Sequence, residues 1–297
     1  AYIFEVSEAE TIAMGDAPEN KDNLIETVQI EAPTQSAPIV CVMDSGIQEE
    51  HKYLAPAISS DESISLLPNN TGTTDEVAGG GHGTRVAGAV LYPKAVPSDG
   101  VYQLPCWIRN MRILDENNCL PENVYPPKAI AIAVQKYNVE NPIPTKIFNH
   151  SIGSRRSCEM KHMTPWAAEI DSQSYNHDVL FIQAAGNIST DVISTYWQAG
   201  YPYPEYLDRE LCRISNPAQS LQAITVGSVS ADELETDDFI ALGKHMEASS
   251  FSRSGPGIWD VLKPECTLVN DVRANQRKNK SSEVVLICKS FTAVWTC

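Results

Sequence analysis

Three side chains in this sequence have the chemistry of a hydrolytic site. Asp44 follows the apolar run IVCVM, so its carboxylate would stand at the carboxyl end of a strand. His82 lies in GGGHGTRVAG, where a helix would begin beside the histidine and small residues would leave room around it. Asn187 ends the run FIQAAGN, from which its amide could donate a hydrogen bond to a developing oxyanion.

Each of these residues has an ordinary structural interpretation when it is taken alone. Asp44 and Asn187 would serve as turn residues, and His82 would be packed or solvent-facing. The glycine run 79–81 also allows a phosphate loop in a nucleotide-binding domain, although no GK[ST] follows it. Taken together in this order, the three residues favour a carboxylate that orients an imidazole base, with an amide that holds the oxyanion.

Apolar strands that alternate with helices must position these side chains. We expect strands over residues 38–46, 107–114, 146–153, 179–187 and 223–230, and helices over residues 82–91, 128–137 and 165–175. This alternation predicts a three-layer α/β fold, with a mostly parallel sheet covered by helices on both faces. Functional residues of such sheets gather past the carboxyl ends of the strands. The Tyr- and Pro-rich segment 196–212 is expected to be a surface insertion.

Five motifs in this order resemble those of the subtilisin-like serine peptidases, the subtilases. They are VCVMDSG, GGGHGTRVAGAV, NHSIGS, FIQAAGN with AITVGSVS, and FSRSGPGIWDVLKPE, which together span about residues 38–266. The resemblance implies a subtilisin-like fold and peptide hydrolysis through an acyl-enzyme, without a cofactor. It assigns Asp44 to orient the imidazole, His82 to act as general base and then acid, and Asn187 to hold the oxyanion.

The resemblance also implies a polypeptide substrate and the residues that bind it. Ser151, Ile152 and Gly153 would pair with an extended peptide as an added strand, and Gly186 would help shape the primary specificity pocket. His150, in the same motif, either packs in the interior or contacts substrate. Calcium often accompanies this family, and the acidic stretches 61–63 and 232–238 offer oxygens, but no metal ligands are assigned.

The expected nucleophile motif, G-T-S, does not occur in these 297 residues. The nearest match is Ser290 in KSFTAV, with seven residues after it, too few for the long helix that supports the nucleophile in this family. A shifted reading frame, a truncated gene or a pseudoenzyme would each produce this ending, and the intact Asp, His and Asn motifs favour the first two. We therefore expect a domain without its C-terminal part, inactive as it stands, with exposed apolar surface and poor solubility. The alternative is a non-catalytic module that binds peptides.

Composition sets the remaining limits. The net charge of −16 argues against nucleic-acid binding, and the late basic cluster (Arg273, Arg277, Lys278 and Lys280) reads as a solvated tail. Eight cysteines without a CxxC pair make zinc improbable. No apolar run is long enough to cross a membrane, and free thiols lean toward a reducing, cytoplasmic compartment, which the sequence does not establish. We expect a leader or accessory segment over residues 1–36, an incomplete peptidase domain over 37–266 and an unrelated tail over 267–297.

Overall fold

The computed structural model describes residues 28–77, 81–94, 96–230, 239–270, 272–277 and 284–288. Its centre is a seven-stranded sheet in which every neighbouring pair of strands is parallel, in the order β10-β8-β7-β6-β2-β5-β3. The strands of this sheet are β2 (Ile39–Asp44), β3 (Ile64–Ser65), β5 (Trp107–Arg112), β6 (Ile147–His150), β7 (Leu180–Ala184), β8 (Ile224–Ser230) and β10 (Cys266–Asn270).

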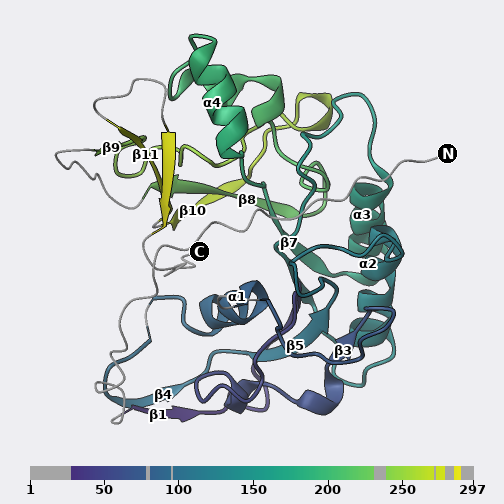
Figure 1. The fold of residues 1–297 in the computed structure, drawn as a ribbon. Coiled ribbons are helices and arrows are strands. Elements are labelled where there is room, and N and C mark those ends of the chain that lie inside the picture. Colours follow the sequence, from purple (N-terminus) through teal and green to yellow (C-terminus); the bar gives the residue numbers. More distant parts are fainter. Residues whose placement is uncertain are drawn as a thin grey trace.

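Helices cover both faces of this sheet (Figure 1). The helices α2 (Pro126–Val134) and α3 (Pro165–His177) lie on one face, and α1 (His82–Leu91) lies on the other. Alternate side chains of β2 explain this arrangement, because Cys41 and Met43 join the core under α2 and α3 while Val40 and Val42 join the core under α1. The predicted three-layer α/β fold with a mostly parallel sheet is confirmed.

Local sequence explains where the helices begin and end. Pro126 and Pro127 occupy the first turn of α2, where proline costs no hydrogen bond, and a π-helical turn over Gln135–Val139 follows the helix. The Thr164 hydroxyl caps α3 by accepting from the amide of Ala167. α4 (Thr190–Gln198) is capped in the same way by Ser189, which accepts from the amide of Val192.

Two small sheets flank the central one. β1 (Val28–Glu31) pairs in parallel with β4 (Gly100–Gln103), so part of the expected leader segment lies against the domain. β9 (Phe239–Ala241), β11 (Val272–Arg277) and β12 (Val284–Cys288) form an antiparallel sheet.

The eight predicted elements are all present, with ends that differ by a few residues. Further elements were not predicted, namely β1, β3, β4, β9, β10, β11, β12 and α4. Two of them bear on the predicted bounds. β10 extends the central sheet to Asn270, and the expected domain end at residue 266 coincides with the first residue of this strand. α4 overlaps the segment 196–212, which is only partly a surface insertion because Tyr206 and Cys212 are fully buried in a small apolar cluster with Ile188 and Ile193.

Candidate active site

The carboxylate of Asp44 and the imidazole of His82 form a hydrogen-bonded pair. Nδ1 of His82 lies 2.8 Å from Oδ1 and 2.9 Å from Oδ2 of Asp44. A carboxylate can only accept hydrogen bonds, so Nδ1 carries the proton and Nε2 is left as the basic nitrogen. Asp44 is fully buried, whereas the His82 side chain keeps 30% of its surface exposed. The pair therefore has the form of an oriented general base.

Close backbone approach between two elements brings the pair together. Asp44 ends β2, and His82 is the first residue of α1. A Cβ atom on Gly83 would lie 2.2 Å from the carbonyl oxygen of Gly46 and 3.0 Å from Cβ of Asp44. Only glycine fits at position 83, because any side chain would push the helix away from the Asp44 turn.

The surroundings of His82 favour its charged form. Burial by itself lowers the pKa of His82, but the charge and hydrogen bond of Asp44 outweigh burial and raise this pKa above its ordinary value. Arg85 lowers it and Asp75 raises it by smaller amounts. Because Asp44 stabilises the protonated imidazole, His82 is suited to accept a proton and return it during acyl transfer.

The predicted substrate-binding segment lies at the same edge of the sheet. β6 and β7 are the next two strands beyond β2, and parallel strands end at one edge, with neighbours about 4.8 Å apart. Ser151, Ile152 and Gly153 continue past β6 and pair with no strand in the described part of the chain. The predicted strand therefore ends at His150, and the three residues after it leave a free edge.

The three residues of this edge differ in their roles. The Ser151 hydroxyl donates to Oδ1 of Asn149 at 2.8 Å, and its side chain lines a cavity. Ile152 is only 1% exposed, so its side chain packs in the core and its backbone is also covered, with the carbonyl oxygen accepting from Gln183. A Cβ atom on Gly153 would lie 2.6 Å from the hydroxyl of Ser215, which leaves no room for a side chain there.

Asn187 and Gly186 line the same cavity as Ser151. The cavity has a volume of about 170 Å³ and is bounded by residues of β6, β7, β8 and β10. Asn187 is half-buried, and its side-chain amide makes no hydrogen bond to the part of the chain that the structure describes. The sheet thus brings Ser151, Gly186 and Asn187 together beside the strand that carries Asp44.

Two buried side chains that sequence reasoning missed support this edge. Gln183 of β7 donates from Nε2 to the carbonyl oxygen of Ile152 at 2.8 Å, and its Oε1 lies 2.6 Å from Nδ1 of His150. Arg253 donates from Nε to the carbonyl oxygen of Asn187. An amide side chain inside the apolar segment VLFIQAAGN was the available signal for Gln183, whereas Arg253, in the serine-rich SFSRSG, had none. His150 itself is buried and packs edge-on against Trp166, so it lies in the interior.

Some predicted features fall outside this description. Ser290 and the acidic stretch 232–238 lie outside the described residues. Glu62, in the other acidic stretch, is paired with Arg109 and Asn141 instead of facing an open site. Within the described ranges, no three His, Cys, Asp or Glu side chains gather as metal ligands. No helix in those ranges has the length and apolar character needed to cross a membrane.

A parallel α/β sheet with an Asp–His pair and an asparagine along its carboxyl edge is the arrangement that the sequence predicted for a hydrolase of the serine-peptidase type. A model of the subtilase family matches residues 35–284, so the chain belongs to the subtilase family. The match covers the predicted Asp, His, substrate-strand and Asn motifs, and the family hydrolyses polypeptides.

Individual relatives are more distant. An uncharacterized protein y4bN of Sinorhizobium fredii (strain NBRC 101917 / NGR234) is 31% identical over 146 residues, which are 47% of this chain and 33% of that protein. This chain thus spans about a third of the length of that relative. Among solved structures, a cold adapted subtilisin-like serine proteinase is 16% identical over 92% of this chain and 74% of that one, with a TM-score of 0.48. A lanthipeptide protease is 18% identical over 78% of this chain and 52% of that one, with a TM-score of 0.44.

Proposed function

We propose that this chain carries the base and oxyanion components of a serine endopeptidase that cleaves peptide bonds through an acyl-enzyme. His82 is the general base and then the general acid, Asp44 orients it, and Asn187 donates to the oxyanion. The observation that carries the proposal is the 2.8 Å contact between Nδ1 of His82 and the buried Asp44. The free edge at Ser151–Gly153 supports binding of an extended peptide as an added strand. The base and oxyanion roles use side chains of this chain, the proposed reaction needs no cofactor, and its serine nucleophile is not assigned to a residue here.

We propose further that the 297 residues do not turn over substrate by themselves. The sequence lacks the G-T-S motif, and His82 has no hydrogen-bond partner other than Asp44 among the described residues. Without a nucleophile, an acceleration of only about 10³- to 10⁴-fold over water would remain.

A peptide chloromethyl ketone tests the base and the peptide edge together, because it binds as a peptide and alkylates a correctly placed imidazole. The carbon–chlorine bond breaks, Nε2 of His82 bonds to the methylene carbon, and chloride leaves. We expect alkylation at His82 in the intact chain, located by peptide mapping, and none in D44N. The exposed His162 is the internal control for unspecific alkylation. Equal labelling of His82 and His162 would remove the support for a substrate-binding site.

A fluorophosphonate probe tests the second part, since it reports a reactive serine. We expect no stoichiometric labelling of this chain. Labelling at Ser290 or another serine would show that the chain holds its own nucleophile.

The alternative function is a peptide-binding module without catalysis. The unpaired Ser151–Gly153 edge favours it, because that edge does not depend on a nucleophile. Micromolar peptide binding without cleavage, measured by calorimetry, would support this alternative. The nucleotide-binding alternative is wrong, because the chain is a subtilase and the start of α1 already holds the carboxylate of Asp75.

A further inference from the structure

Asp75 is a buried carboxylate to which the proposed mechanism gives no role. Its side chain belongs to a residue only 3% exposed, and it lies seven positions before His82. Burial of a carboxylate is costly unless hydrogen bonds satisfy it. Four donors do so here: the Ser45 hydroxyl, the Val77 amide, and both the amide and the hydroxyl of Thr84.

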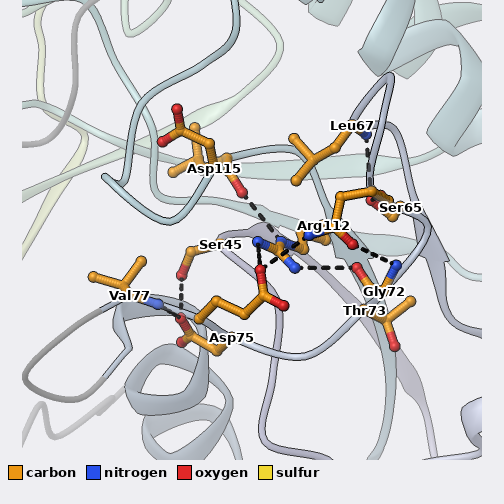
Figure 2. Close-up of polar contacts among 12 residues, drawn as sticks. Ser45, Ser65, Leu67, Gly72, Thr73, Asp75, Val77, Arg112 and Asp115 are labelled. Atoms are coloured by element: carbon orange, nitrogen blue, oxygen red, sulfur yellow. Dashed lines mark hydrogen bonds and ion pairs between the residues drawn. The ribbon is translucent and has the colours of Figure 1, made fainter.

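These donors come from both halves of the Asp44–His82 pair. Ser45 directly follows Asp44, and its hydroxyl donates to Oδ1 of Asp75 at 3.1 Å (Figure 2). Thr84 lies two residues after His82, and its amide and hydroxyl donate to Oδ2 at 3.1 and 3.0 Å. The same Ser45 hydroxyl accepts from the amide of Gly83 at 3.0 Å. One carboxylate therefore ties the turn that carries the aspartate to the helix that carries the histidine.

The shape of the helix start matches this carboxylate. A Cβ atom on Gly81 would lie 1.6 Å from Oδ2 of Asp75. The carboxylate therefore occupies the space that a side chain at position 81 would need. The amides at the first turn of α1 also carry the positive end of the helix dipole, which stabilises a negative charge. Position 75 thus favours a small acceptor with a full negative charge.

A second buried charge holds the segment that presents Asp75. The guanidinium of Arg112, which is fully buried at the end of β5, donates to the carbonyl oxygen of Gly72 at 3.2 Å (Figure 2). It also donates to the carboxylate of Glu76 at 2.8 Å. Its hydrogen bond and charge hold the pKa of Glu76 below its ordinary value. The amide of Ile47 donates to the carbonyl oxygen of Thr73 at 3.1 Å, which docks the same segment under the Asp44 turn.

We propose that Asp75 is a positioning residue for the Asp44–His82 pair, acting through Ser45 and Thr84. Its carboxylate fixes the distance between the end of β2 and the start of α1, and so the short contact between the two side chains. The role assigned to that pair rests on the proposed function, but the geometry of the pair does not.

Magnetic resonance of the intact chain tests this inference without any substrate. The proton between Nδ1 of His82 and Asp44 should give a low-field signal, which H82Q would assign by removing it. In D75N the amide group cannot accept from all four donors, so we expect the low-field signal to be lost and the pKa of His82 to fall. The charged groups that act on His82 are Asp44, Asp75 and Arg85.

S45A separates position from charge. This variant keeps the charge of Asp75 and removes only the Ser45 hydroxyl, which donates to Asp75 and accepts from the amide of Gly83. We expect exchange of the low-field proton with solvent to become about tenfold faster, the factor that one hydrogen bond supplies.

D171N is the matched control. Asp171 also joins a helix to a loop, accepting from the Ser220 hydroxyl and from the amides of Leu221 and Gln222, but it lies on α3, on the opposite face of the sheet from α1. It should lose stability on thermal melting and leave the signal of His82 unchanged.

Two outcomes would overturn the inference. One is a D75N chain whose low-field signal and titration match those of D171N. The other is an S45A chain with unaltered exchange, which also decides the matter if D75N does not fold. Failure of the proposed function looks different: His82 of the wild-type chain would resist the chloromethyl ketone while its low-field proton still depended on Asp75.

Discussion

The guanidinium of Arg253 donates from Nε to the main-chain carbonyl oxygen of Asn187, at 2.9 Å. Its terminal nitrogens donate to the carbonyl oxygens of Leu211 and Arg213, each at 2.8 Å, and to that of Arg155. Arg253 is 3% exposed, so one buried cation binds four carbonyl oxygens from three backbone segments behind the asparagine. The position of Asn187 therefore depends on a residue 66 positions later in the chain.

We expect R253M to destabilise the chain by about 2–4 kcal/mol, because buried carbonyl oxygens would lose their donor. R253K should fall between R253M and the wild type, since one ammonium cannot reach all four acceptors. Urea unfolding of the three proteins measures the difference. Equal midpoints for R253M and wild type would contradict the role assigned to this side chain.

Two glycines of α1 give a matched pair of substitutions. G83A would drive a Cβ atom into the carbonyl oxygen of Gly46, so we expect a loss of about 2–4 kcal/mol and no alkylation of His82 by the chloromethyl ketone. Nothing lies within 4 Å of the corresponding position at Gly88, so G88A should stabilise the helix by about 0.5–1 kcal/mol. Thermal melting compares the two variants. A G83A chain as stable as G88A would contradict the close backbone approach between Gly83 and Gly46.

Gln183 is expected to control peptide affinity through the carbonyl oxygen of Ile152. Q183L leaves that carbonyl and His150 without their partner, so the Ser151–Gly153 edge should shift and peptide binding should weaken about tenfold. Q219L is the control, because Gln219 is equally buried but donates to the carbonyl oxygen of His162. Calorimetric titration with one peptide should distinguish them. Equal affinity in both variants would show that Gln183 serves stability alone.

His150 should make the chain less stable in mild acid. Burial lowers the pKa of His150 to about 4, although its hydrogen bond to Gln183 and the charge of Asp44 oppose this shift. The unfolded chain binds the proton at about pH 6.5, so the contribution of His150 is present above that pH and is lost as the pH falls toward 4. The loss amounts to about 3 kcal/mol. H150Q should flatten the dependence of unfolding free energy on pH in this window, and an unchanged dependence in H150Q would contradict this assignment.

His82 should change the free energy of unfolding with pH in the opposite direction to His150. Its folded-state pKa is raised, so its contribution to stability is present below about pH 6.5 and is lost as the pH rises through the folded value. The stability difference between wild type and H82Q should therefore shrink as the pH rises from 5.5 to 9. A difference that grows with pH would mean that Asp44 does not hold the proton on His82.

The motifs made part of this site predictable. Asp44 and Asn187 follow apolar strands whose ends the parallel sheet brings to one edge, and His82 lies in a glycine-rich motif that begins a helix. The strands of the sheet were predictable for the same reason, since long apolar runs bounded by turn residues have few other structures.

The supporting residues were not predictable, because their partners are distant in the chain. Asp75 looks like one acidic residue in a polar stretch until Ser45 and Thr84 fold around it, and Arg253 contacts carbonyl oxygens that carry no sequence signal. β10 was missed because CTLVN is short and has no family pattern, and its place in the sheet comes from pairing with β8.

The order of strands in the central sheet has a consequence for synthesis on the ribosome. β2 pairs with β5 and β6, and β6 leaves the ribosome roughly 100 residues after Asp44, which takes on the order of 5–20 s at typical translation rates. Until then the apolar strand that ends in Asp44 has an unpaired side. The nascent chain must therefore pass through a period in which its central strand is open to aggregation or to capture by chaperones, and slowing translation before β6 should lengthen it.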